Sequence, residues 1–133
     1  MKTIVAFSDL HYMEIPEKVR SVAEESDYVF FLGDGGSRLG DLLFHKGLVA
    51  VKGNCDDCPF PREEVVDIEG VKILATHGDL YSVKRDLLPI ALRANELGCG
   101  LVLYGHTHCA QTEEFDGVTL INPGSIQSPV IGT

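Results

Sequence analysis

The chain has 133 residues, which is the size of one domain with its own hydrophobic core. Its 44% apolar and 23% charged residues are typical of a globular protein and argue against disorder. The 20 acidic residues outnumber the 11 Lys and Arg and give a net charge of −9, so we expect no dedicated nucleic-acid binding, which needs clustered basic side chains.

Nothing in the sequence suggests export or a membrane. No segment approaches the roughly 20 apolar residues of a membrane span. The apolar run at residues 4–7 is too short for a signal peptide and is followed directly by Asp9. The spacing of the 4 cysteines suggests no disulfide framework, so we expect reduced thiols, as in proteins of a reducing compartment. We therefore expect a cytoplasmic protein without membrane contacts.

The first half of the chain alternates between apolar runs and amphipathic segments. Strands buried on both faces are predicted at residues 4–7, 28–32 and 48–51. Pro16 begins a predicted helix that extends to Glu25, and residues 40–46 predict one or two helical turns. This alternation of strands and helices predicts parallel strands joined by right-handed connections.

Two hairpins are predicted in the second half of the chain. Their strands span residues 65–68 and 71–76, then 110–115 and 118–121. The Asp116-Gly117 pair between the last two segments is the strongest short hairpin signal in the chain.

A helix and a further strand are predicted between these hairpins. An apolar stripe at helical spacing covers residues 83–97, and Gly98 should end that helix. Pro89 lies inside the stripe and should kink or split the helix. Residues 101–104 then predict a buried strand.

Five apolar runs end in polar residues that lie next to glycine. These ends are Ser8-Asp9-Leu10-His11, Gly33-Asp34, Gly53-Asn54, His77-Gly78-Asp79 and Gly105-His106-Thr107-His108. Sites in open α/β sheets form beyond the carboxyl ends of the strands. We therefore expect these polar side chains to gather at one edge of the protein.

The side chains expected to gather there are typical ligands of transition metals. They are Asp9, His11, Asp34, Asn54, His77, His106 and His108. Imidazoles mixed with carboxylates suit Mn, Fe, Co, Ni or Zn better than Mg or Ca. Seven ligands exceed one tetrahedral site, so we expect two divalent ions that share a carboxylate. Such a pair activates a bridging hydroxide and stabilises an in-line displacement at phosphorus.

The five motifs, in this order over nearly the whole chain, resemble those of the calcineurin-like metallophosphoesterase superfamily. Asn122-Pro123-Gly124-Ser125 follows them, as is usual in that family. Because Cys55 follows the Gly-Asn pair, the chain looks most similar to the small prokaryotic phosphodiesterase branch. The resemblance implies one α/β domain over residues 1–133, with a compact, β-sandwich-like mixed sheet flanked by helices.

The resemblance also implies how the metal ligands are divided. One metal would be held by Asp9, His11 and His108, and the other by Asn54, His77 and His106, with His106 and His108 interchangeable. Asp34 would bridge the two metals. Manganese is the metal we expect, with Ni, Co, Fe and Zn as alternatives.

The implied reaction is phosphodiester hydrolysis of a small phosphate ester by a metal-bridging hydroxide. Its implied catalytic residues are His106, which would stabilise the phosphoryl oxygens, together with Asn54 and Cys55. Cys55 stands where better-studied members have a histidine that donates a proton to the leaving group, and its thiol is a weaker donor. Diester and monoester substrates therefore both stay open.

Several alternatives remain beside this interpretation. The same fold resembles a retromer scaffold subunit that has lost catalysis, although the ligand set is complete here. Relatives usually continue past residues 122–125 into a further strand, whereas this chain ends at Thr133. The expectation is therefore a bare sheet edge, an edge covered by a second copy of the chain, or a domain that is short at its C-terminus. Cys55 and Cys58 have the spacing of half a zinc site.

A few polar residues outside the ligand set each have two possible roles. Asp56 and Asp79 either orient a metal ligand or are simply solvated. Arg38 either holds a phosphate oxygen or is a solvated loop residue. His45 is predicted to be a surface helix residue.

Overall fold

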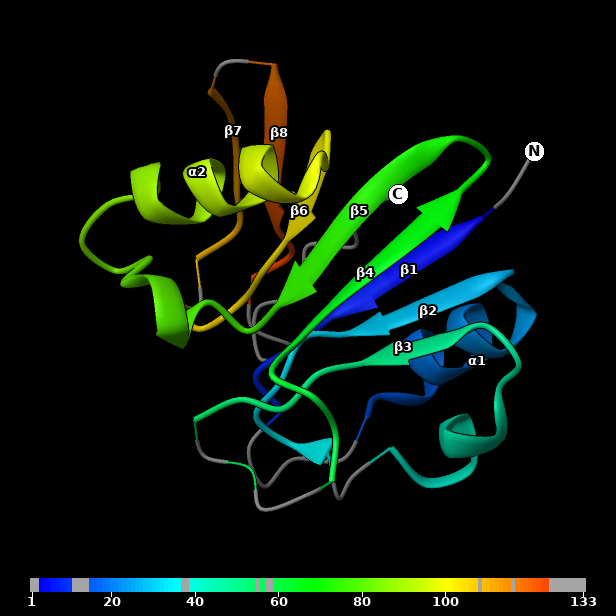
Figure 1. Cartoon of the computed structure of the whole chain (residues 1–133). Helices are drawn as coiled ribbons and strands as arrows, with labels where there is room; N and C mark the ends of the chain where they lie inside the picture. The colour runs from blue at the N-terminus through cyan, green and yellow to red at the C-terminus, as the bar shows by residue number, and fades with distance from the viewer. Residues whose placement is uncertain are drawn as a thin grey trace.

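The computed structural model describes residues 3–10, 15–36, 39–54, 56, 59–107, 109–115 and 117–124. They form two β-sheets that pack against each other, with one helix on the outer side of each sheet (Figure 1). This arrangement confirms the predicted β-sandwich-like α/β fold.

The first sheet has three parallel strands in the order β1-β2-β3. They are β1 (Ile4–Phe7), β2 (Tyr28–Phe31) and β3 (Leu48–Ala50). Helix α1 (Glu17–Glu25) connects β1 to β2, and the 3-10 helix η2 (Gly40–Phe44) lies between β2 and β3. The predicted parallel pairing is thus confirmed.

His45 differs from its prediction as a surface helix residue. It ends η2 and is half-buried. The Gly47 amide donates to Nδ1 of His45 at 2.9 Å, so Nε2 carries the proton and donates to the carbonyl of Ser26 at 2.8 Å. Through these two hydrogen bonds, His45 connects the segment before β3 to the end of α1.

The second sheet has five strands in the order β4-β5-β6-β8-β7. They are β4 (Glu63–Ile68), β5 (Val71–Thr76), β6 (Leu101–Leu103), β7 (Gln111–Phe115) and β8 (Val118–Asn122). The central strands β5, β6 and β8 are parallel, whereas β4 and β7 pair as antiparallel hairpin partners of β5 and β8. Both predicted hairpins are confirmed.

The helix predicted over residues 83–97 is shorter in the structure. Helix α2 (Leu88–Leu97) follows the 3-10 helix η3 (Asp79–Tyr81) and a stretch of turns. Pro89 lies in the first turn of α2, where its missing N–H breaks no helical hydrogen bond. The predicted helix is therefore divided near Pro89: residues 83–87 lie outside the helix, and α2 begins at Leu88. Gly98 ends the helix with a φ of 74°, as predicted.

Three apolar clusters hold these layers together. One joins α1 and η2 to the outer face of the first sheet, and another joins α2 to the outer face of the second. The third lies between the two sheets and contains Phe30, Leu32 and Val51 from the first and Ile73 and Leu103 from the second. Within the described residues, no helix has the length and apolar character to cross a membrane.

The cluster between the sheets predicts a strong contrast between two phenylalanines. Phe30 is 0% exposed and Phe44 is 85% exposed. Phe30→Ala should lower the free energy of unfolding by about 3–5 kcal/mol because it leaves a cavity between the sheets. Phe44→Ala, the matched control, should change it by no more than about 0.5 kcal/mol. Urea unfolding measures both, and equal losses would contradict this packing.

Candidate metal centre

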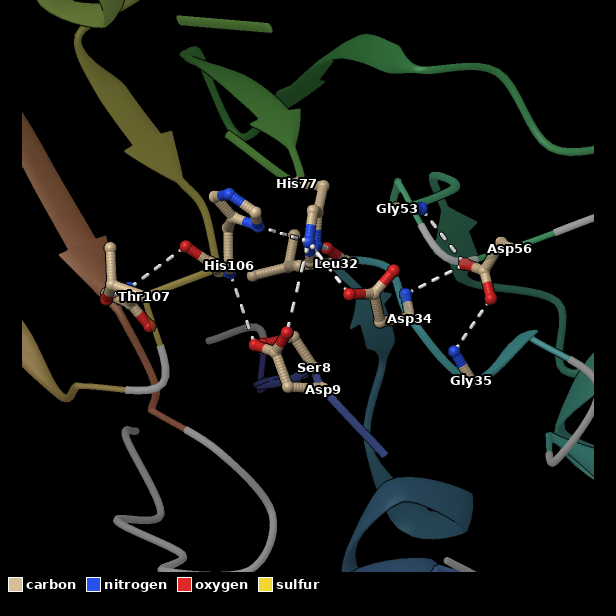
Figure 2. Close-up of polar contacts among 12 residues, drawn as sticks. Ser8, Asp9, Leu32, Asp34, Gly35, Gly53, Asp56, His77, His106 and Thr107 are labelled. Carbon is tan, nitrogen blue, oxygen red and sulfur yellow. Dashed lines mark hydrogen bonds and ion pairs between the residues drawn. The ribbon is translucent and has the colours of Figure 1, made fainter. Parts of the chain in front are cut away.

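Four of the predicted ligand residues meet where the two sheets join. Asp9, Asp34, His77 and His106 follow β1, β2, β5 and β6, respectively. The first two strands belong to one sheet and the last two to the other. Figure 2 shows the four side chains pointing toward one another. The expected convergence is therefore seen for these residues.

His77 lies at the centre of this group. Its Nε2 is 3.2 Å from Oδ2 of Asp34, 3.9 Å from Oδ1 of Asp9 and 3.1 Å from Nδ1 of His106. Asp9, Asp34 and His77 are almost completely buried, whereas His106 is half-buried. The group is thus a buried cluster that reaches the surface at His106.

The other ring nitrogen of His77 fixes which atom faces the cluster. Nδ1 lies 2.7 Å from the carbonyl oxygen of Leu32, and a carbonyl can only accept a hydrogen bond. Nδ1 therefore carries a proton and donates it to Leu32. This arrangement turns Nε2 toward Asp34 and Asp9, as in histidines that ligate metals.

Asp9 is held by two donors on the same oxygen. The Ser8 hydroxyl donates to Oδ2 at 2.6 Å, and the backbone N–H of His106 donates to the same atom at 3.2 Å. Its own N–H donates to the carbonyl of Gly33 at 2.9 Å. These bonds tie the loops after β1, β2 and β6 together and aim Oδ1 at His77.

The charges in the cluster affect the two histidines differently. Burial lowers the pKa of His77, but the hydrogen bond and negative charge of Asp34 outweigh it, so the pKa lies above its ordinary value. Burial, followed by the charges of His77 and Lys84, lowers the pKa of His106. These surroundings therefore favour a positive charge on His77 and disfavour one on His106.

Three residues of the cluster adopt a left-handed backbone conformation. The φ angles are 58° for Asp9, 62° for Asp34 and 73° for His106. This region is costly for residues other than glycine and is enriched at functional sites. The surrounding contacts must therefore stabilise these three loops in a conformation that the isolated chain would avoid.

Two motif glycines are required because the strand-end loops approach so closely. A Cβ at Gly33 would lie 2.6 Å from Nδ1 of His77. A Cβ at Gly53 would lie 2.7 Å from Cγ of Asp34 and would overlap its carboxylate. The glycines thus allow the ends of β2, β3 and β5 to pack closely. The sequence alone suggested only that these glycines allow sharp turns.

Asn122 secures the loop that carries His106. Its Nδ2 donates to the carbonyl of Gly105 at 3.2 Å and to Oγ1 of Thr107 at 2.9 Å. Its Oδ1 accepts the N–H of Gly124 at 2.9 Å. This buried side chain therefore joins the end of β8 to the residues on both sides of His106.

Several predicted residues fall outside the part of the chain that the structure describes. His11, Cys55 and His108 lie outside the described residues, as do Arg38 and Cys58. Asn54 is exposed in the turn after Gly53, and its role stays a prediction. Asp79 is half-buried and pairs with Arg62 at 3.2 Å, so it is not simply solvated.

The donor atoms present fit a divalent transition metal. Asp34, His77 and His106 each offer one such atom, and the three atoms lie within 4.8 Å of one another. One carboxylate oxygen and two imidazole nitrogens form the mixed set that Mn, Fe, Co, Ni and Zn accept. Asp9 adds a second carboxylate beside them.

Comparison with known proteins gives the class of this fold and site. The family model of the calcineurin-like phosphoesterase superfamily domain matches residues 1–133, and the chain belongs to that family. The probable metallophosphoesterase YsnB of Bacillus subtilis is 36% identical over 131 residues, covering 95% of this chain and 76% of YsnB. Phosphodiesterase YfcE of Escherichia coli K12 is 33% identical over 102 residues, covering 69% of this chain and 50% of YfcE.

Solved structures agree with this membership. A predicted phosphoesterase from Streptococcus pneumoniae aligns with a TM-score of 0.83 and 33% identity, covering 99% of this chain and 76% of its own. Wild-type Vps29 of Entamoeba histolytica, solved with Zn²⁺, aligns with a TM-score of 0.77 and 25% identity, covering 92% and 73%. The family resemblance seen in the motifs is confirmed, and it supports a phosphoesterase that binds divalent metal.

The close approach at Gly53 gives a test of the cluster. Gly53→Ala should weaken Mn²⁺ binding by about 10–100-fold or more, because the new Cβ displaces the carboxylate of Asp34. Gly100→Ala is the matched control, because nothing lies within 4 Å of a Cβ there. Titration calorimetry measures both affinities, and unchanged binding by Gly53→Ala would show that this packing does not support the site.

Proposed function

We propose that this protein is a phosphodiesterase that depends on two divalent transition-metal ions. The observation that carries the proposal is the gathering of one carboxylate and two imidazoles, with donor atoms within 4.8 Å, beside the buried Asp9. The similarity to phosphodiesterase YfcE supports diester cleavage in particular. The substrate is a small phosphate ester.

The residues that would hold the metals are those the sequence predicted. Asp9, Asp34, His77 and His106 already face one another, and His11, Asn54 and His108 complete the set by resemblance to the family. Manganese is the ion we propose, and Zn²⁺ bound to Vps29 supports a transition metal in this fold. Bound divalent ions would supply Lewis-acid activation of a water and would neutralise the phosphate.

The chain itself prepares the site for that chemistry. Leu32 holds the Nδ1 proton of His77, so Nε2 stays turned toward the carboxylates. Ser8 and the His106 amide hold one oxygen of Asp9 and leave the other facing the cluster. These groups are fixed before a ligand arrives, so little reorganisation is needed on binding.

His106 is placed to contact the substrate. It is the least buried of the four residues, and its Nδ1 is turned toward His77. Burial, followed by the charges of His77 and Lys84, lowers the pKa of His106 and so disfavours a charge on its ring. A neutral imidazole can stabilise an oxygen of a phosphoryl group by donating a hydrogen bond.

Hydrolysis of bis-p-nitrophenyl phosphate in the presence of Mn²⁺ tests the proposal. Asp34→Asn and His77→Ala should each reduce kcat/KM by at least about 100-fold, because each removes a donor from the cluster. Asp41→Asn, on the exposed side of η2, is the control and should leave turnover unchanged. Chelation should abolish turnover in the unsubstituted protein.

Two outcomes would count against this function. Turnover that persists in both variants after chelation would exclude a metal-dependent reaction at this cluster. Metal binding without turnover of any phosphate ester would instead favour the alternative, a scaffold or binding module that keeps the fold, which the structural likeness to Vps29 allows.

A further inference from the structure

The Asp56 carboxylate accepts four backbone N–H groups from two different loops. Oδ1 accepts from Gly35 at 2.7 Å and from Gly36 at 3.2 Å. Oδ2 accepts from Asp34 at 2.8 Å and from Gly53 at 2.9 Å. A carboxylate has about four acceptor positions, so these amides occupy its full capacity.

The two loops held by Asp56 are those that carry candidate metal ligands. Residues 34–36 follow β2 and contain Asp34, and Gly53 precedes Asn54 after β3. The N–H of Asp56 itself donates to the carbonyl of Gly53 at 3.2 Å, so its own turn is closed as well. One side chain thus joins the ends of two neighbouring parallel strands.

The backbone around Asp34, which Asp56 holds, adopts a costly conformation that needs stabilising contacts. Asp34 has a φ of 62°, and Gly33 and Gly35 on either side have φ angles of 102° and 134°. Successive amides in this conformation converge on one point and favour an anion there. Bonds from N–H groups to an ionised carboxylate are roughly twice as strong as neutral ones, so Asp56 can offset the cost of the left-handed Asp34.

The direction of Asp56 separates it from the metal ligands. Figure 2 shows it on the side of Asp34 away from His77 and His106, with its oxygens turned to the amides. It therefore holds the backbone of Asp34 from one side while the Asp34 side chain reaches Nε2 of His77 on the other. Its hydrogen bonds also exclude the reading of Asp56 as a simply solvated residue.

We propose that Asp56 is a positioning residue, which aims the carboxylate of Asp34 at the metal centre by fixing the amides of residues 34–36 and 53. This inference rests on the proposed function, because it assigns Asp56 a role in metal binding at that site. Asp56 touches neither substrate nor metal and acts only through Asp34 and the loop after β3.

Replacing one oxygen of Asp56 tests this role. Asp56→Asn keeps the size of the side chain but offers one acceptor and turns an NH₂ group toward two amides. We expect its Mn²⁺ affinity to fall by about 10–100-fold, and the visible absorption spectrum of bound Co²⁺ to change because Asp34 ligates in a different geometry. Asp56→Glu retains the charge and should recover part of the affinity, and it serves if the amide variant does not fold.

Asp67→Asn is the matched control. Asp67 also accepts a backbone N–H, that of Gly70 at 3.0 Å, but in the exposed turn between β4 and β5. The Asp67→Asn variant should bind Mn²⁺ with the affinity of the unsubstituted protein and give the same Co²⁺ absorption spectrum. Folded Asp56 variants with unchanged affinity and spectrum, even if less stable, would overturn the inference and leave the proposed function intact. Unsubstituted protein that takes up no metal would overturn both.

Discussion

The hydrogen bond from Nδ1 of His77 to the carbonyl of Leu32 is the contact on which the site depends. His77 follows β5 of one sheet and Leu32 follows β2 of the other, so this 2.7 Å bond joins the sheets at their carboxyl ends. It also fixes the proton on Nδ1 and turns Nε2 toward Asp34 and Asp9. One hydrogen bond therefore both joins the two sheets and orients the predicted metal ligand His77.

This contact requires the two sheets to lie very close together. The apolar cluster between them packs the sheets together, and Phe30 and Leu32 are 0% exposed within it. At the strand ends the space is so small that Gly33 and Gly53 admit no side chain. Around this point Asp9, Asp34 and His106 take left-handed conformations that the packed loops stabilise. The core thus sets the geometry of the site.

The sequence predicted most of the strands and the members of the cluster, because buried strands read as apolar runs and their polar ends are conspicuous. It missed one local boundary and several contacts between distant parts of the chain. The start of α2 was predicted too early, because the apolar stripe does not show that the helix begins only at Leu88, next to Pro89. The four amides on Asp56 join residues up to 22 positions apart, and no local pattern reveals that pairing. Asn122 was noted in its motif, but its bonds to Gly105 and Thr107 depend on the pairing of β6 with β8.

Metal content is the most direct measurement of whether these strand ends form a metal centre. Elemental analysis of the purified protein after equilibration with Mn²⁺ and removal of unbound ions gives the number of ions per chain. We predict about two, as a two-metal phosphoesterase requires, with none retained after chelation. Protein that retains no Mn, Fe, Co, Ni or Zn under any loading condition would contradict the assignment of Asp9, Asp34, His77 and His106 as metal ligands.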